Sequence, residues 1–192
     1  FFAQSGMGYS LCRGGLYHHA VGVAVIAEQL ARLTGAAKPG IAYAAGLLHD
    51  IGKVVLDQFV GGAYPLFYRQ LIEEGTTDFT QAEQALFETT HPAVGFQLAQ
   101  RWSFPDSLAE AIRSHHEAEP GSRHRGLGSL VFLSNLLMSR FHAGLEIGRQ
   151  VTRTITPRLA AVGLAPGQLP QIVDLIPMDV FEASPAAASR PA

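Results

Sequence analysis

Residues 44–56 read AAGLLHDIGKVVL, an apolar run that contains the adjacent pair His49–Asp50 and the lysine Lys53. A chain that buries this segment removes an imidazole, a carboxylate and an ammonium from water. Such burial is costly unless the groups pair with one another or bind a metal ion. A cation of charge two would offset the charge of Asp50 and turn His49 into a ligand, so this stretch is the candidate centre of a metal site.

The sequence on both sides of this stretch has helical periodicity. Leu16 to Leu30 carries apolar residues at three- and four-residue steps, with a stop at Gly35, and a second helix is predicted from Pro39 to about Gly52. Further helices are expected over 64–74, from the capping-box sequence TQAE at 80–83, from Pro92, from Pro105, and over 127–142, 156–163 and 166–176. No strand pattern competes, so we predict an all-α bundle of about eight helices.

Composition limits the kind of protein. The 192 residues, 47% of them hydrophobic, suit one core. A net charge of -2 without a basic stretch argues against polymeric nucleic acid as a partner, and no apolar run reaches the roughly 20 residues of a membrane helix. The lone Cys12 fits the cytoplasm. Because no Met begins the sequence, residues 1–14 are expected to lead in from a longer chain, with the domain over 15–183 and a disordered tail over 184–192.

Five histidines fall at or near the ends of predicted helices: His19, His49, His91, His115 and His116. Helix ends can bring such side chains into one cavity, and Asp50 offers a carboxylate able to bridge two ions. Imidazole suits Fe, Mn, Zn and Ni better than Ca or Mg, so the pattern indicates one or two divalent transition-metal ions. Taken one at a time, each histidine has the alternative of a buried ring bonded to a backbone carbonyl.

Short motifs occur in a fixed order along the chain: HHA at 18–20, LLHDIGK at 47–53, HPAVG at 91–95, AIRSHHE at 111–117 and LVFLSN at 130–135. This ordered set resembles the HD superfamily of metal-dependent phosphohydrolases. With RWSFP at 101–105 and the double histidine after it, the chain more narrowly resembles the HDOD group of bacterial signalling proteins, over roughly residues 10–145. The resemblance implies an HD-domain fold.

The resemblance also implies a ligand set. It places His19, His49 and Asp50 around one metal ion, and His91, His115 and His116 around a second ion that Asp50 would bridge. Asn135 stands where catalytic members have a final aspartate, and it is a weaker ligand. Gly15 occupies the position of a glutamate found in some two-metal relatives, and EAEPGSRHRG at 117–126 lacks the Gly-Tyr-Pro motif of cyclic-di-GMP phosphodiesterases.

Two cations are candidates for contact with a phosphate. The resemblance implies that Lys53 lies beside the phosphate, as a catalytic residue together with Asp50, although Lys53 could equally be a surface residue past a helix end. Arg113, one turn before His116, is a candidate substrate contact, with an ion pair to Glu110 or Glu117 as the alternative. His18, His124 and His142 are expected outside the site, and Trp102, Phe104 and Phe132 in the core.

Two functions therefore remain open. One is a regulatory module that presents a surface or nucleotide pocket to a signalling partner, with weak or absent hydrolysis. The other is an active metal-dependent phosphohydrolase acting on a nucleotide or cyclic nucleotide. The neutral Asn135 favours the module, whereas the intact His49–Asp50 pair favours the enzyme. We expect the module, with a nucleotide or a signalling protein as its partner.

Overall fold

The structure is a computed structural model that describes residues 8–9, 15–74, 79–117, 124–143, 152–174 and 176. The predicted tail over 184–192, Cys12 and the side chain of His142 lie outside the described residues. The described ranges contain α-helices and one 3-10 turn, without a strand, which confirms the all-α prediction. The elements are α1 (Gly15–Thr34), α2 (Pro39–Leu48), α3 (Ile51–Gly62), α4 (Tyr64–Glu74), α5 (Phe79–Phe87), α6 (His91–Arg101), α7 (Asp106–Ser114), α8 (Arg125–Ala143), α9 (Thr152–Ala161), η1 (Pro166–Gln168) and α10 (Leu169–Asp174).

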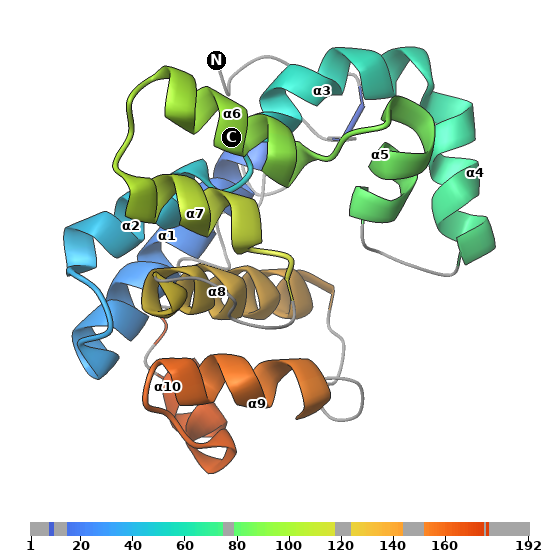
Figure 1. The fold of residues 1–192 in the computed structure, drawn as a ribbon. Coiled ribbons are helices and arrows are strands. Elements are labelled where there is room, and N and C mark those ends of the chain that lie inside the picture. The colour runs from blue at the N-terminus through green and yellow to red at the C-terminus, as the bar shows by residue number, and fades with distance from the viewer. Residues whose placement is uncertain are drawn as a thin grey trace, which may run out of the picture.

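The helices pack as a bundle with a smaller lobe at one end. Helix α1 lies against α2 and α8, while α7 packs between α6 and α8 (Figure 1). Helix α9 covers the side of α8 that faces away from α7. Helices α3, α4 and α5 form the lobe at the upper right of Figure 1, and α3 joins it to the bundle by packing on α6.

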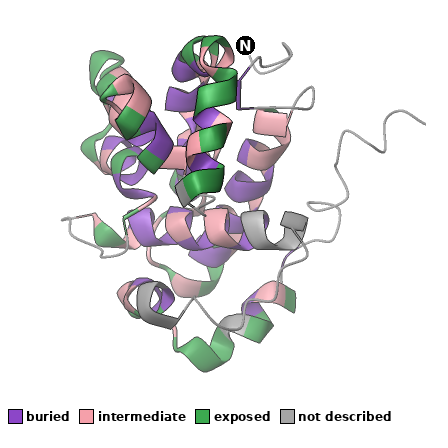
Figure 2. Ribbon diagram, turned by 90° about the vertical axis from the view of Figure 1, so that its right-hand side faces the viewer, coloured by how far each residue is buried: buried purple, intermediate pink, exposed green. Residues whose placement is uncertain are grey.

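Two apolar cores hold these helices, and Figure 2 shows the buried residues on their inward faces. The larger core lies in the bundle and includes Ile26, Leu30, Ile112, Leu130, Leu133, Leu159 and Ile172. The smaller core lies in the lobe and consists of Tyr9, Leu56, Val60, Phe67, Leu71 and Ala82. Helix α3 contacts both, because Ile51 packs against the larger core and Leu56 belongs to the smaller one. The turn before α3 is therefore fixed from two sides.

The predicted second helix is wrong in its extent. Helix α2 ends at Leu48, His49 and Asp50 form a turn, and α3 follows over a segment for which no helix was predicted. Gly52, expected as a stop, lies in the first turn of α3, where a Cβ atom would meet the carbonyl oxygen of His91 at 2.0 Å. Glycine is needed here because the backbones of α3 and α6 approach closely, and helical periodicity runs through the turn without a break.

Two of the three aromatic residues predicted for the core lie there, and one does not. Phe104 and Phe132 are partly buried and pack against the larger core, as predicted. Trp102 is 53% exposed, so its assignment to the core is wrong. The reason is local: α6 ends at Arg101, and Trp102 sits at its C-terminal cap with its ring 5.7 Å from that of Phe104. Among the described helices, none is long and apolar enough to span a lipid bilayer.

Candidate metal centre

The five histidines come together, as the sequence predicts. His19 lies in the first turns of α1, the pair His49–Asp50 forms the turn between α2 and α3, and His91 is the first residue of α6. His115 and His116 follow directly after α7. Two sets of side chains in the described part of the chain have ligand atoms that all lie within 4.8 Å of one another. We call them the His19 group (His19, His49, Asp50) and the His91 group (Asp50, His91, His115, His116).

Asp50 belongs to both groups through different oxygen atoms. Its Oδ2 lies 3.7 Å from His19 Nε2 and 3.3 Å from His49 Nε2. Its Oδ1 lies 3.3 Å from His91 Nε2 and 3.4 Å from His115 Nε2. A carboxylate that presents one oxygen to each group has the geometry of a bridging ligand, which is the arrangement that the family resemblance implies for Asp50.

Hydrogen bonds on the far side of three rings determine which nitrogen faces inward. His49 Nδ1 donates to the carbonyl of Gly46 at 2.7 Å, and His115 Nδ1 donates to the carbonyl of Ile112 at 2.6 Å. His91 Nδ1 donates to Glu83 at 2.8 Å. Carbonyl and carboxylate oxygens can only accept, so these Nδ1 atoms carry the proton and the Nε2 lone pairs of the neutral rings point at Asp50.

The inward-facing atoms suit a cation. His91 Nε2 lies 3.2 Å from His115 Nε2 and 3.1 Å from His116 Nε2. His91 and His115 both carry the proton on Nδ1, so their Nε2 lone pairs face each other and repel unless a cation lies between them. Within the described residues, His49 Nε2 and Asp50 Oδ1 are also buried without a hydrogen-bond partner. Buried polar atoms are rarely left so, and a bound divalent ion would satisfy both.

Burial keeps His19 and His115 neutral. It lowers the pKa of His19 to about 3, although the Asp50 carboxylate acts in the opposite direction. It also holds the pKa of His115 well below its usual 6.5, assisted by the nearby His116. Burial opposes the ionisation of Asp50, but the neighbouring charges, among them the ammonium of Lys53 at 2.8 Å, outweigh it and hold the pKa of Asp50 well below 3.8. Neutral imidazoles around an ionised carboxylate are the protonation states that metal ligands require.

Asn135 and Lys53 both lie at the His19 group. The side chain of Asn135, on α8, is close enough to hydrogen-bond His19 and thereby acts on the pKa of that ring. Lys53 is buried on α3, with Nζ 2.8 Å from Asp50 Oδ2, so the alternative of a surface lysine is wrong. The same ammonium lies 5.4 Å from the centre of the Phe79 ring. Contact of Lys53 with a phosphate stays a prediction.

Arg113 lies apart from the cluster. Its guanidinium is 3.8 Å from Glu110, with the side chain 56% exposed, and it stacks 5.2 Å from the centre of the Phe96 ring. The ion pair named as the alternative is therefore present in the structure. Arg113 also lines a cavity of about 420 Å³ with Thr90, Gln97 and Glu117. A substrate contact at Arg113 stays a prediction.

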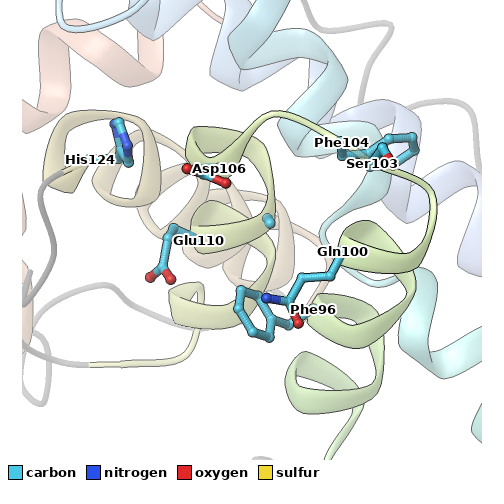
Figure 3. A pocket seen from close by; sticks show the side chains of 8 residues that line it. Phe96, Gln100, Ser103, Phe104, Asp106, Glu110 and His124 are labelled. Atoms are coloured by element: carbon cyan, nitrogen blue, oxygen red, sulfur yellow. The ribbon is translucent and has the colours of Figure 1, made fainter.

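A larger cavity, of about 670 Å³, opens between α6 and α7 (Figure 3). Phe96 and Gln100 line it from α6, and Asp106 and Glu110 from α7. His124, expected outside the site, is half-buried at this cavity. His18 is half-buried beside Tyr17 and belongs to neither ligand group. None of the residues of the two ligand groups lines either of these two cavities.

The role of Glu83 was not predicted from the sequence. The sequence TQAE predicts a capping box between Thr80 and Glu83, but the Glu83 carboxylate is fully buried and faces His91 instead. It accepts hydrogen bonds from His91 Nδ1 and, at 2.7 Å, from the His91 backbone N–H. These bonds outweigh burial and keep the pKa of Glu83 below 4.5. The available signal was the position of Glu83 on the apolar face of its helix, between Phe79 and Phe87.

A second supporting residue, Arg158 on α9, was also not predicted. Arg158 is buried, and its Nη2 donates to the carbonyls of Ser114, at 3.1 Å, and Glu117. Those two carbonyls flank the pair His115–His116. The guanidinium lies over Phe132, 5.0 Å from the ring centre. Arg158 thus fixes the turn that carries two ligands of the His91 group.

Comparison with known sequences gives one family and two relatives. The sequence model of the HDOD domain matches residues 2–118. The chain is 30% identical over 145 residues to an uncharacterized protein of Treponema pallidum, covering 73% of this chain and 27% of that protein. It is 31% identical over 102 residues to ribonuclease Y of Aquifex aeolicus, covering 53% of this chain and 13% of that enzyme. The chain thus spans about a quarter or less of these relatives.

Several solved structures share the fold of this chain, and one of them is an HDOD domain protein. One, from Marinobacter aquaeolei and described as a signal transduction protein, has a TM-score of 0.72 at 26% identity, covering 91% of this chain and 39% of that one. An HDOD domain protein of unknown function from Geobacter sulfurreducens has a TM-score of 0.67, also at 26% identity, covering 91% of this chain and 65% of that one. A Shewanella amazonensis protein described as a phosphohydrolase shares the fold, with a TM-score of 0.63 at 19% identity over 86% of this chain and 60% of that one.

Proposed function

Because the chain belongs to the HDOD domain family, we propose that it is a regulatory module of a signalling protein that holds one or two divalent transition-metal ions and hydrolyses phosphate esters weakly or not at all. The observation that carries the metal site is the shared carboxylate of Asp50, whose Oδ1 is buried without a hydrogen-bond partner beside the Nε2 atoms of His91 and His115. The His19 group, with Asn135 beside it, would hold one ion and the His91 group the other.

Burial and charge support the module over the enzyme. A bound divalent ion would supply positive charge to Asp50 and accept the Nε2 lone pairs. A structural ion needs only satisfied ligands, whereas a catalytic ion needs an open position. His49, Asp50, His91 and His115 are each at most 5% exposed. The ammonium of Lys53 already contacts Asp50, and Asn135 brings no charge. The similarity to the Marinobacter signal transduction protein points in the same direction.

Metal content tests the first half of this proposal. Purified protein is loaded with Mn, Fe, Zn or Ni, desalted and analysed for metal, beside Asp50→Ala and the matched control Asp106→Ala. Asp106 is an exposed carboxylate at the cavity between α6 and α7, away from the cluster. We expect the parent and Asp106→Ala to retain metal and Asp50→Ala to lose it. A parent that retains none, or an Asp50→Ala variant that retains as much, would contradict the metal site.

Hydrolysis tests the second half. The loaded protein is incubated with a general phosphodiester, cyclic dinucleotides, nucleoside phosphates and RNA, the last because of the similarity to ribonuclease Y. Asp50→Ala serves as the blank for contaminating hydrolases. Equal traces in both samples support the module. Turnover on the order of 1 per second that Asp50→Ala abolishes would establish the alternative, an active metal-dependent phosphohydrolase.

Asn135→Asp gives a gain-of-function prediction for the His19 group. The position lies beside His19, and an aspartate there would add a charged ligand to a group that has one carboxylate. We expect higher metal occupancy or tighter binding, measured by competition with a chelator. Unchanged stoichiometry and affinity would show that the side chain at position 135 does not face the ion.

A further inference from the structure

One buried carboxylate next to the metal centre belongs to neither ligand group. Glu83 uses one oxygen, Oε2, on the backbone N–H of His91 and shares Nδ1 of the same ring between Oε1 and Oε2, each at 2.8 Å. Oε1 also accepts the hydroxyl proton of Tyr9 at 2.6 Å. A carboxylate behind a metal-binding histidine fixes the tautomer and orientation of the ring and raises its basicity. Tyr9 in turn fixes the carboxylate.

Tyr9 comes from a short segment that is itself firmly docked. The backbone N–H groups of Gly8 and Tyr9 both donate to Asp57 Oδ1 on α3, at 3.1 and 3.0 Å. The hydroxyl of Tyr68 on α4 donates to the carbonyl of Gly8 at 3.2 Å. Gly8 fits because a Cβ there would meet the Asp57 carbonyl oxygen and Val60 Cβ at 2.7 Å. The segment therefore has one closely fitted position on the lobe.

The contacts of Tyr9 connect this segment to the ligands of both groups. The Tyr9 ring packs edge-on against Phe67 and Phe79, in the smaller core. The ammonium of Lys53, which contacts Asp50, lies 5.9 Å from the centre of the same ring. Through Glu83 the hydroxyl reaches His91. Displacing Tyr9 would remove one hydrogen bond from Glu83 and take away one of the aromatic rings that lie beside the Lys53 ammonium.

We propose that Glu83 and Tyr9 are positioning residues that couple the docking of the Gly8–Tyr9 segment to metal affinity at His91. The inference rests on the proposed metal site and adds a regulatory input to it, because a movement of the chain at Gly8–Tyr9 would change how strongly His91 binds. Such coupling is reciprocal: whatever the docked segment adds to metal affinity, the metal adds to the docking of the segment.

A purely structural role for Tyr9 is the competing explanation, and the chain offers a control for it. Tyr68→Phe removes a tyrosine hydroxyl that binds the same segment, at Gly8, but does not touch Glu83. Tyr9→Phe removes the hydroxyl that binds Glu83. Both variants lose one hydrogen bond to the docked segment. Only Tyr9→Phe changes the carboxylate behind His91.

The experiment measures Co²⁺ affinity by chelator competition, and the Co²⁺ absorption spectrum, for the full chain and its Glu83→Gln, Tyr9→Phe and Tyr68→Phe variants. An amide in place of the Glu83 carboxylate cannot accept hydrogen bonds through both of its end atoms, so Glu83→Gln should bind about 10- to 100-fold more weakly, with an altered spectrum. Tyr9→Phe should bind several-fold more weakly, and Tyr68→Phe, which leaves the Tyr9–Glu83 hydrogen bond in place, should lose clearly less affinity than Tyr9→Phe. In the parent, Co²⁺ should also slow amide exchange at Gly8 and Tyr9.

Each outcome separates the two proposals. A parent that binds no Co²⁺ would overturn the metal site itself. A parent that binds, with Glu83→Gln and Tyr9→Phe equally tight, would overturn the coupling and leave the site standing. Equal losses in Tyr9→Phe and Tyr68→Phe would overturn the positioning role of the Tyr9–Glu83 hydrogen bond, because metal affinity would then follow docking of the segment by any of its contacts. If Glu83→Gln does not fold, the comparison of the two tyrosine variants decides.

Discussion

Two histidines of the cluster, His19 and His115, are neutral in the folded protein, each with one ring proton. The Nδ1 atoms of His49 and His115 donate to backbone carbonyls, and burial lowers the pKa values of His19, to about 3, and His115, well below 6.5. In an unfolded chain a histidine has a pKa of about 6.5. Below that pH these histidines bind protons in the unfolded chain but stay neutral in the folded protein. Stability of the metal-free protein is therefore fully present above pH 6.5 and is lost as the pH falls.

We expect the metal-free protein to lose stability in acid, starting near pH 6.5. Each such histidine contributes up to about 1.4 kcal/mol per pH unit to the fall in the free energy of unfolding. Urea unfolding at several pH values between 8 and 4 measures it. His19→Gln should reduce the slope, whereas His18→Gln, next to it but outside both ligand groups, should not. A free energy of unfolding that stays level from pH 7 to pH 5 would contradict the prediction.

The distance between Asp50 and His91 depends most directly on the contact between helices α3 and α6. Gly52 of α3 faces the backbone of His91 and Gly95 at the start of α6. A Cβ at Gly52 would lie 2.0 Å from His91 O and 2.8 Å from Gly95 N, both backbone atoms that cannot rotate away. One of the two helices must then move, and each carries a ligand at its N-terminal end.

Gly52→Ala should therefore lower both stability and metal affinity. Overpacking of this kind costs about 1–3 kcal/mol, and the displacement of His91 should weaken Co²⁺ binding in addition. Gly62→Ala is the matched control at the other end of α3, where an added Cβ meets nothing within 4 Å. It should be neutral or stabilising by up to about 1 kcal/mol. Thermal unfolding and chelator competition measure the two effects, and equal behaviour of both variants would refute the close approach.

Most of the helices could be predicted because their ends carry local signals. Proline marks the start of α2, and α6 begins one residue before Pro92. The break between α2 and α3 has no such signal. His49 still has helical geometry, and the backbone leaves the helix at Asp50, with φ -97° and ψ 14°, a position that no glycine or proline marks.

That the histidines and Asp50 come together could be predicted, but the residues that support them could not. The histidines and Asp50 occur in an ordered set of motifs, so their roles follow from a resemblance. Glu83 has an equally good local explanation, the capping box, and only the fold brings it to His91. Arg158 lies more than 40 residues after the turn that it holds, at Ser114 and Glu117, and no spacing rule connects positions so far apart.

The whole molecule is larger than the part that defines its family. The HDOD model matches residues 2–118, yet Asn135 on α8 and Arg158 on α9 both lie beyond it and reach the cluster or its supporting turn. Leu130, Leu133 and Leu159, also beyond residue 118, are buried in the larger core. The helices after the matched region therefore share the larger core and contribute side chains to the candidate metal centre or its supporting turn.

Arg158→Met tests this dependence. Ser114 and Glu117 would lose their buried charged donor, which should cost about 2–3 kcal/mol and loosen the turn that carries His115 and His116. Arg101→Met, at an exposed arginine, is the matched control. Urea unfolding measures stability, and Co²⁺ competition measures the His91 group. A variant with parental stability and affinity would show that α9 does not support the centre.

The chemical reactivity of Lys53 should report whether the cluster around Asp50 is open or closed. Lys38 and Lys53 are the two lysines of the sequence, and Lys38 is exposed at the start of α2, whereas Lys53 is buried against Asp50. An amine-specific acylating reagent should modify Lys38 rapidly and Lys53 only when the cluster opens. The ratio of the labelled Lys53 peptide to the labelled Lys38 peptide in a mass spectrum would then measure how often the cluster opens. Ligands, metals or partners that loosen or tighten the centre could be found by this ratio alone, without an assay for any activity.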